Sequence, residues 1–312
     1  MTEGQRGLLK GFRADLKNPD GQLHWILQRV RVDRTLCLEI RENYLNIYYR
    51  GCSLMNVQVA GDSYSISLDD GYLEEVDLEQ PPKDDLEQWR VSVPLLKDAV
   101  DLAFFKKKRS LEREFQQLVV WENNLWTSTD PDSNSTDYFV CDQEYDNRRG
   151  AKFDLVAVRW PSRSAERKKD RDLRLALVEM KYGDGSLQDN PSKKTAGIEK
   201  HASDFLSFIQ DGASWPAFAD EMKCLFNQKL DLGIIKCKKP IVSFSETPEV
   251  LFLLANHDPD STILREVLGA AQPKIDELVR MGVRVAFTRA AYCGYALFED
   301  QFIQWDELRR IL

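Results

Sequence analysis

FDLVAVRW at residues 153–160 and LALVEMKYG at residues 175–183 decide the fold of the second half of this chain. Both stretches are short and rich in β-branched and large apolar residues, as β-strands are. The LALV run does not alternate with polar residues, which is typical of a strand buried in the centre of a sheet. Each stretch nevertheless holds an acid, Asp154 or Glu179. Because a lone carboxylate is costly among apolar neighbours, both acids are candidates for a functional site.

The spacing of these charged residues predicts a metal site for hydrolysis. Glu179 and Lys181 are two residues apart in one strand, so their side chains point to the same side. Asp154 can reach that place from the neighbouring strand. With the carbonyl of Met180, the two carboxylates form a hard oxygen site suited to Mg²⁺ or Mn²⁺. A lysine beside such a site can orient the attacking water or stabilise phosphorane charge, which is what phosphodiester hydrolysis needs.

This pattern resembles the PD-(D/E)xK, or restriction-endonuclease-like, nuclease superfamily over about half of the chain. The resemblance implies that Asp154 is the strand acid and that Glu179 and Lys181 form the ExK pair. Phe153 stands where the named motif has proline. A charged insertion, PSRSAERKKDRD at 161–172, lengthens the connection between the two acids.

Many members of this superfamily add a glutamate from the helix that precedes the sheet. Here the segment LEREFQQ at 111–117 offers Glu112 and Glu114. Both lie at the edges of the apolar face of the expected helix, so helical spacing does not separate them. We prefer Glu112 as the catalytic helix acid and keep Glu114 as the alternative.

The pattern of apolar runs predicts two domains. Residues 1–90 are expected to be an α+β accessory domain, with a helix at 23–30 and a four-stranded antiparallel meander. A proline-containing acidic linker follows at 79–88, and Pro94 is expected in the first turn of the next helix. Residues 91–312 are expected to be an α/β domain, with a mixed sheet flanked by helices in the restriction-endonuclease-like arrangement. Its hairpin is expected to turn at 147–150.

Charge is segregated along the chain, whose net charge is −8. Segment 69–87 is acidic, whereas 106–109 (KKKR) and 163–174 are basic. Basic segments favour contact with nucleic-acid phosphates, although a solvated loop or helix face gives the same pattern. The acidic segment is an alternative partner for the basic loop and would block it. The candidate nucleic-acid-binding residues are Arg167, Lys168, Lys169, Arg171, Lys194 and His201; the alternative for His201 is a place at the edge of the core.

Several classes of protein are disfavoured. No stretch of eighteen apolar residues exists, and the first residues lack the apolar region of a signal peptide, so no membrane association is expected. The 6 cysteines are scattered without a CxxC pair, which favours a reducing cytoplasm. The 3 histidines have no metal-ligand spacing, which disfavours zinc chemistry.

The sequence therefore predicts a cytoplasmic, Mg²⁺- or Mn²⁺-dependent nuclease. The resemblance favours DNA as substrate and a role in defence against phage. Tyr44, Tyr48 and Tyr49 in the N-terminal domain suit either base stacking or packing of a sheet face. That domain is also the expected contact for a second copy or a partner protein. The alternative function is a catalytically silent nuclease fold that binds nucleic acid or protein.

Overall fold

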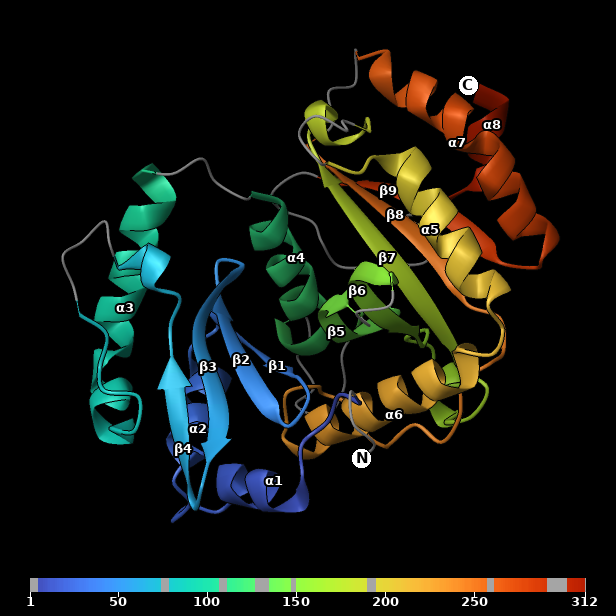
Figure 1. Ribbon diagram of the computed structural model, residues 1–312. Coiled ribbons are helices and arrows are strands. Elements are labelled where there is room, and N and C mark those ends of the chain that lie inside the picture. The colour runs from blue at the N-terminus through green and yellow to red at the C-terminus, as the bar shows by residue number, and fades with distance from the viewer. Residues whose placement is uncertain are drawn as a thin grey trace. The chain divides into compact units, whose positions relative to one another are not determined.

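The fold is described from a computed structural model, in which the chain forms two compact units (Figure 1). The structure describes residues 5–73, 79–106, 111–126, 135–146, 150–189, 195–256, 261–290 and 302–311. The first unit comprises Met1–Gln117 and Asn227–Ile235, and the second comprises Leu118–Phe226 and Lys236–Leu312. No helix within the described ranges has the length and apolar character needed to cross a bilayer.

The first unit contains the expected four-stranded antiparallel meander, with strands β1 Leu36–Ile40, β2 Tyr44–Tyr49, β3 Cys52–Ala60 and β4 Ser63–Ser67 in sequential order. Arg50 and Gly51 join β2 to β3, and both have positive φ, 51° and 74°. Tight hairpins favour this conformation because it matches the twist of the strands. A Cβ at Gly51 would also overlap the backbone of Arg113, so this turn requires glycine.

Three helices accompany the meander: α1 Lys10–Lys17, α2 His24–Val32 and α3 Leu86–Lys106. The helix expected at 23–30 is α2. Pro94 lies inside α3 and not in its first turn, so that expectation was wrong. The helix begins earlier because Asp85 caps it, accepting a hydrogen bond from the Gln88 backbone N–H at 2.9 Å.

The last residues of α6 (Trp215–Asp231) belong to the first unit although they lie far along the sequence. The Gln228 side chain accepts a hydrogen bond from the Leu8 backbone N–H at 2.8 Å. Lys229 Nζ lies 2.7 Å from Glu39 Oε2 on β1, and both side chains are fully buried. The domain boundary expected near residue 90 falls inside α3, whereas the compact units divide within α4 (Leu111–Trp121) and within α6.

The second unit is built on a six-stranded mixed sheet of order β10-β9-β8-β7-β6-β5. Strands β5, β6 and β7 are antiparallel, β7, β8 and β9 are parallel, and β10 is antiparallel to β9. Figure 1 shows α5 lying along the sheet beside α7. A mixed sheet flanked by helices is therefore confirmed. The elements from α4 onward are α4 Leu111–Trp121, β5 Tyr138–Asp146, β6 Lys152–Arg159, β7 Arg174–Tyr182, α5 Ile198–Gln210, α6, β8 Glu249–Ala255, α7 Ile263–Arg280, β9 Arg284–Ala290, β10 Ile303–Gln304 and α8 Trp305–Ile311. The first part of α4 and the last part of α6 belong to the first unit.

The sheet is apolar at its centre, as the LALV run predicted. Every residue from Leu175 to Lys181 on β7 is buried, and so is the whole of β8. Burial on both faces explains why this part of the sequence does not alternate. The β5–β6 hairpin is present, while most of its expected turn, 147–149, lies outside the described residues.

Candidate active site

The site begins where strands β6 and β7 part. Their antiparallel ladder ends at the pair Leu155 and Val178, so Asp154 lies one residue beyond the last pair. The Met180 backbone N–H donates to Asp154 Oδ2 at 2.7 Å. The Asp154 carboxylate thus accepts the N–H that a backbone carbonyl of β6 would accept if the ladder continued. Asp154 is therefore in direct contact with the backbone of the residue that separates Glu179 from Lys181.

Glu179 forms the centre of the site. Lys181 Nζ lies 2.7 Å from Glu179 Oε1, and His201 Nε2 lies 2.8 Å from the same oxygen. The side chains of Glu179 and Lys181 are only 2% and 6% exposed. A carboxylate this deeply buried requires charged or hydrogen-bonding partners, and Lys181 and His201 supply them.

His201 reaches this place because of the way α5 packs. Ile198, Ala202 and Phe205 form the buried side of that helix, and His201 lies next to them in the helical order. The sequence left two alternatives for His201, a nucleic-acid-binding surface or the edge of the core. Its contact with Glu179 was not predicted. The only signal was its position beside Ile198 and Phe205, because the register between a helix and a strand is a tertiary property.

The start of α5 is fixed by a close approach to the loop after β7. The Gly197 backbone N–H donates to Asp189 Oδ1 at 2.6 Å. A Cβ at Gly197 would overlap the backbone of Leu187 and Gln188. This loop follows the ExK strand directly, so it ties the position of His201 to that of β7.

The donor set at this place fits a small divalent cation. Mg²⁺ is typically held by one or two carboxylates together with water and phosphate oxygens. Asp154 and Glu179 are two such carboxylates. In a strand, the N–H and C=O of one residue point to the same edge, so the Met180 carbonyl is directed to the edge where Asp154 lies. Among the residues the structure describes, no group of three or more His, Cys, Asp or Glu side chains is arranged as a metal site.

A third carboxylate lies on the next strand. The pairs Gln143–Leu155 and Tyr145–Phe153 flank Glu144, which places it opposite Asp154 in the β5–β6 register. Glu144 has φ 54°, an unusual value for a residue within a strand. We therefore regard Glu144 as adjacent to the site, whereas Asp146 forms an ion pair with Lys152 at 2.8 Å.

The two candidate helix acids belong to the first unit, and the strand acids belong to the second. Glu114 Oε1 receives a hydrogen bond from Arg50 Nε at 2.8 Å, which ties Glu114 to the meander. Glu112 is half-buried on the same helix. The assignment of Glu112 as the catalytic helix acid stays a prediction.

The basic segment 163–174 divides into two kinds of residue. Arg167 donates to the Thr136 carbonyl, and its guanidinium lies 4.4 Å from the centre of the Phe139 ring. Burial lowers the pKa of Arg167 to about 10, so it remains cationic near neutral pH. Lys168, Lys169 and Arg171 are exposed. Arg167 therefore supports the fold, and the other three are accessible cations, as is Arg163.

The remaining basic candidates cannot be placed. Lys194 and the sequence 107–109 of the KKKR run lie outside the described residues. Comparison of the chain with protein-family models, with curated proteins and with solved structures found no match.

Proposed function

We propose that this protein is a metal-dependent nuclease of the PD-(D/E)xK type. The observation that carries the proposal is the meeting of Asp154, Glu179 and Lys181 at the ends of adjacent strands. Lys181 and Glu179 are in contact at 2.7 Å, and Asp154 binds the backbone of the residue between them. These two contacts support the proposal, because they join residues that the sequence suggested for one chemistry.

Asp154, Glu179 and the Met180 carbonyl would hold Mg²⁺ or Mn²⁺. The cation would supply Lewis-acid polarisation of a phosphate and a water of lowered pKa. Lys181 carries a positive charge beside this set, where it can orient water and stabilise charge that develops on the phosphate. His201 holds the Glu179 carboxylate from α5 and is a positioning residue.

DNA is the favoured substrate because the resemblance is to enzymes that mostly cut DNA. Lys168, Lys169 and Arg171 are exposed cations in the same unit as the site, which suits contact with phosphates. Defence against phage is the biological role that we propose with it. The N-terminal unit would then be the part that contacts a second copy or a partner protein.

The decisive experiment is a cleavage assay on the purified full-length chain. Mixed DNA and RNA substrates are incubated with Mg²⁺ or Mn²⁺, with and without EDTA. We expect EDTA-sensitive cleavage that falls roughly 10²- to 10³-fold in Lys181→Ala, because a charge that acts on the transition state is lost. Lys152→Ala, which removes an exposed lysine from the same sheet, is the matched control. Full activity in Lys181→Ala would contradict the assignment.

A catalytically silent fold is the second candidate, and the contacts of the site give it one specific argument. Lys181 and His201 both engage Glu179 Oε1, and a backbone N–H engages Asp154. These interactions are also what a purely structural network needs. A silent fold would show no EDTA-sensitive cleavage and no heat of Mn²⁺ binding that depends on Asp154. A positive result in either measurement favours the enzyme.

A further inference from the structure

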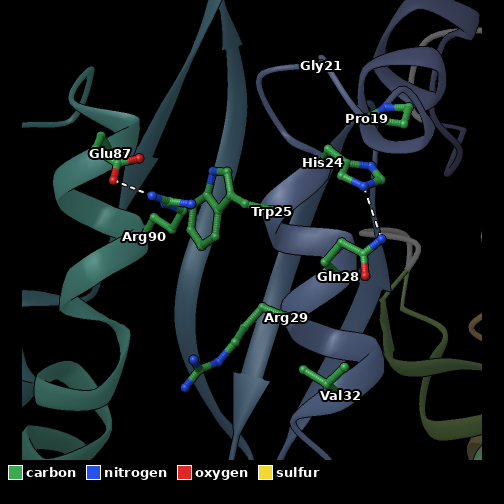
Figure 2. Close-up of a pocket in the computed structure, with 9 residues that line it drawn as sticks. All are labelled: Pro19, Gly21, His24, Trp25, Gln28, Arg29, Val32, Glu87 and Arg90. Carbon is green, nitrogen blue, oxygen red and sulfur yellow. Dashed lines mark hydrogen bonds and ion pairs between the residues drawn. The ribbon is translucent and has the colours of Figure 1, made fainter.

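A cleft in the first unit lies between α2 and the beginning of α3, well apart in sequence from the strand acids (Figure 2). Its cavity volume is about 620 Å³, within the range of small-molecule sites. One face of α2 supplies most of the lining, and α3 supplies Glu87 and Arg90. The other lining residues are Pro19, Gly21, His24, Trp25, Gln28, Arg29 and Val32.

The cleft combines an aromatic ring with cations. Figure 2 shows Trp25 projecting from α2 towards α3 and Arg90 projecting from α3 towards α2. The Trp25 N–H is enclosed and has no acceptor among the described residues, so Trp25 offers its ring to the cleft and not a hydrogen bond. Indole rings bind planar groups by stacking, and guanidinium groups bind phosphates.

The charges of the cleft leave a positive excess. Arg90 pairs with Glu87 at 2.6 Å, but both side chains are more than half exposed, so a ligand anion can readily replace this weak pair. Arg29 lies 3.3 Å from Asp33, whose carboxylate is also held by Lys97 at 3.0 Å. Asp33 and Lys97 do not line the cleft, so among its lining residues two cations, Arg29 and Arg90, face one carboxylate, Glu87.

Gln28 is oriented for recognition of a polar edge. His24 Nδ1 lies 3.1 Å from the Leu16 carbonyl, which fixes the proton on Nδ1. His24 Nε2 is then an acceptor, and it receives the Gln28 amide N–H at 3.0 Å. This hydrogen bond turns the Gln28 carbonyl oxygen away from His24, as Figure 2 shows. An oriented amide of this kind can bind the edge of a nucleobase.

We propose that this cleft binds a nucleotide, with the base against Trp25 and Gln28 and the phosphate at Arg90. The site goes beyond the nuclease proposal and does not depend on it. Two sources share this chemistry, a free mononucleotide and the phosphorylated 5′ end of a nucleic acid. Both present a planar base joined to a phosphate, and this unit is small enough to lie in one cleft.

Titration calorimetry on the full-length chain tests the site. The probes are AMP, GMP, CMP, UMP, adenosine, ribose 5-phosphate and a 5′-phosphorylated tetranucleotide, without divalent cation. We expect at least one mononucleotide or the tetranucleotide to bind. Adenosine and ribose 5-phosphate should bind about tenfold more weakly than AMP, because each lacks one half of the recognised group. Binding by the tetranucleotide alone would support the proposal and identify a strand end as the ligand.

Single substitutions test the base contact and the phosphate contact one at a time. Trp25→Leu and Arg90→Gln should each raise Kd about tenfold. Phe105→Leu removes an exposed ring from α3, and Lys10→Gln removes an exposed cation from α1; neither should change Kd. Arg90 is exposed, so its substitution tests the site even if Trp25→Leu does not fold. No heat with any nucleotide at millimolar concentration, an unchanged Kd in Arg90→Gln, or ribose 5-phosphate binding as tightly as AMP would overturn the proposal.

Discussion

At the scale of single residues, the two strand acids are held in different ways, and this difference can be measured. Asp154 accepts a backbone N–H, whereas Glu179 compensates the charge of a buried lysine. Asn can still accept the Met180 N–H through its amide oxygen. Gln at 179 would leave Lys181 buried beside a neutral partner. If both acids hold the metal, as proposed, the two isosteric changes have the same consequence for cleavage and unequal consequences for folding.

We expect Asp154→Asn to change the free energy of unfolding by less than about 1 kcal/mol and Glu179→Gln to lower it by on the order of 3 kcal/mol. Both should abolish Mg²⁺-dependent cleavage. Urea unfolding followed by circular dichroism measures the first effect, and the cleavage assay measures the second. Asp306→Asn, an exposed acid on α8, is the control for both. Equal stability of the two variants would show that Lys181 does not depend on the charge of Glu179.

The basic segment gives a second prediction at this scale. Arg167→Gln should destabilise the protein by roughly 1–3 kcal/mol, because the hydrogen bond to Thr136 and the contact with Phe139 are lost. Lys168, Lys169 and Arg171 replaced together by Gln should leave stability nearly unchanged. If this segment contacts DNA, the triple variant should also flatten the salt dependence of binding by up to roughly three units. A salt slope that changes only in Arg167→Gln would reverse the roles assigned to these residues.

At the scale of elements, the beginning of α5 determines where His201 lies. Gly197→Ala places a methyl group against the Leu187 carbonyl, so the helix start must shift. We expect lower stability and a slower cleavage rate, since the Glu179–His201 contact at 2.8 Å moves with the helix. Gly269→Ala in α7 is the matched control, because no atom lies near its added Cβ. It should stabilise the protein by up to about 1 kcal/mol.

The sequence predicts elements better than contacts between them. The LALV run identifies β7 as a central strand, and the ExK spacing makes Glu179 and Lys181 meet, because both are local consequences of strand geometry. The contact of His201 with Glu179 depends on how α5 is set against the sheet, which no local pattern encodes. For Arg167, a run of charges does not reveal which guanidinium turns inward. Pro94 suggested a helix start because a proline also suits a first turn.

At the scale of the whole molecule, the first unit needs residues that lie far along the chain. Glu39 on β1 and Lys229 on α6 form a buried pair, and Arg41 Nη1 lies 3.9 Å from the same glutamate oxygen. Removal of one partner leaves an uncompensated buried charge. We expect Lys229→Met or Glu39→Gln to lower the free energy of unfolding by about 3–5 kcal/mol.

The double variant should recover part of this loss, because both charges are then gone. A double-mutant cycle from urea unfolding measures the coupling energy. The exposed pair Lys274–Glu199 is the control, for which a coupling below about 1 kcal/mol is expected. Strictly additive losses at Lys229 and Glu39 would contradict the inferred coupling.

Deletion of residues 1–90 is therefore a poor test of whether the acidic segment blocks the basic loop. The deletion removes Glu39 and leaves Lys229 without this partner. We expect the truncated chain to be destabilised for that reason alone, which would mask any gain in activity. Neutralising the described acids Asp84, Asp85 and Glu87 by Asn or Gln tests the blocking idea while the meander stays intact.

The discontinuity of the first unit also sets an order of assembly during synthesis. The ribosome completes the four strands of the meander long before it adds Lys229, at about 5–20 residues per second. Throughout that interval the nascent chain carries Glu39 with Arg41 nearby but without Lys229, the nearer of its two cations in the finished protein. The N-terminal meander therefore gains its contact with Lys229 only after α6 has been made. That helix is synthesised after β5, β6 and β7 of the second unit and before β8, so the buried pair closes across a stretch of chain that holds half of the second sheet.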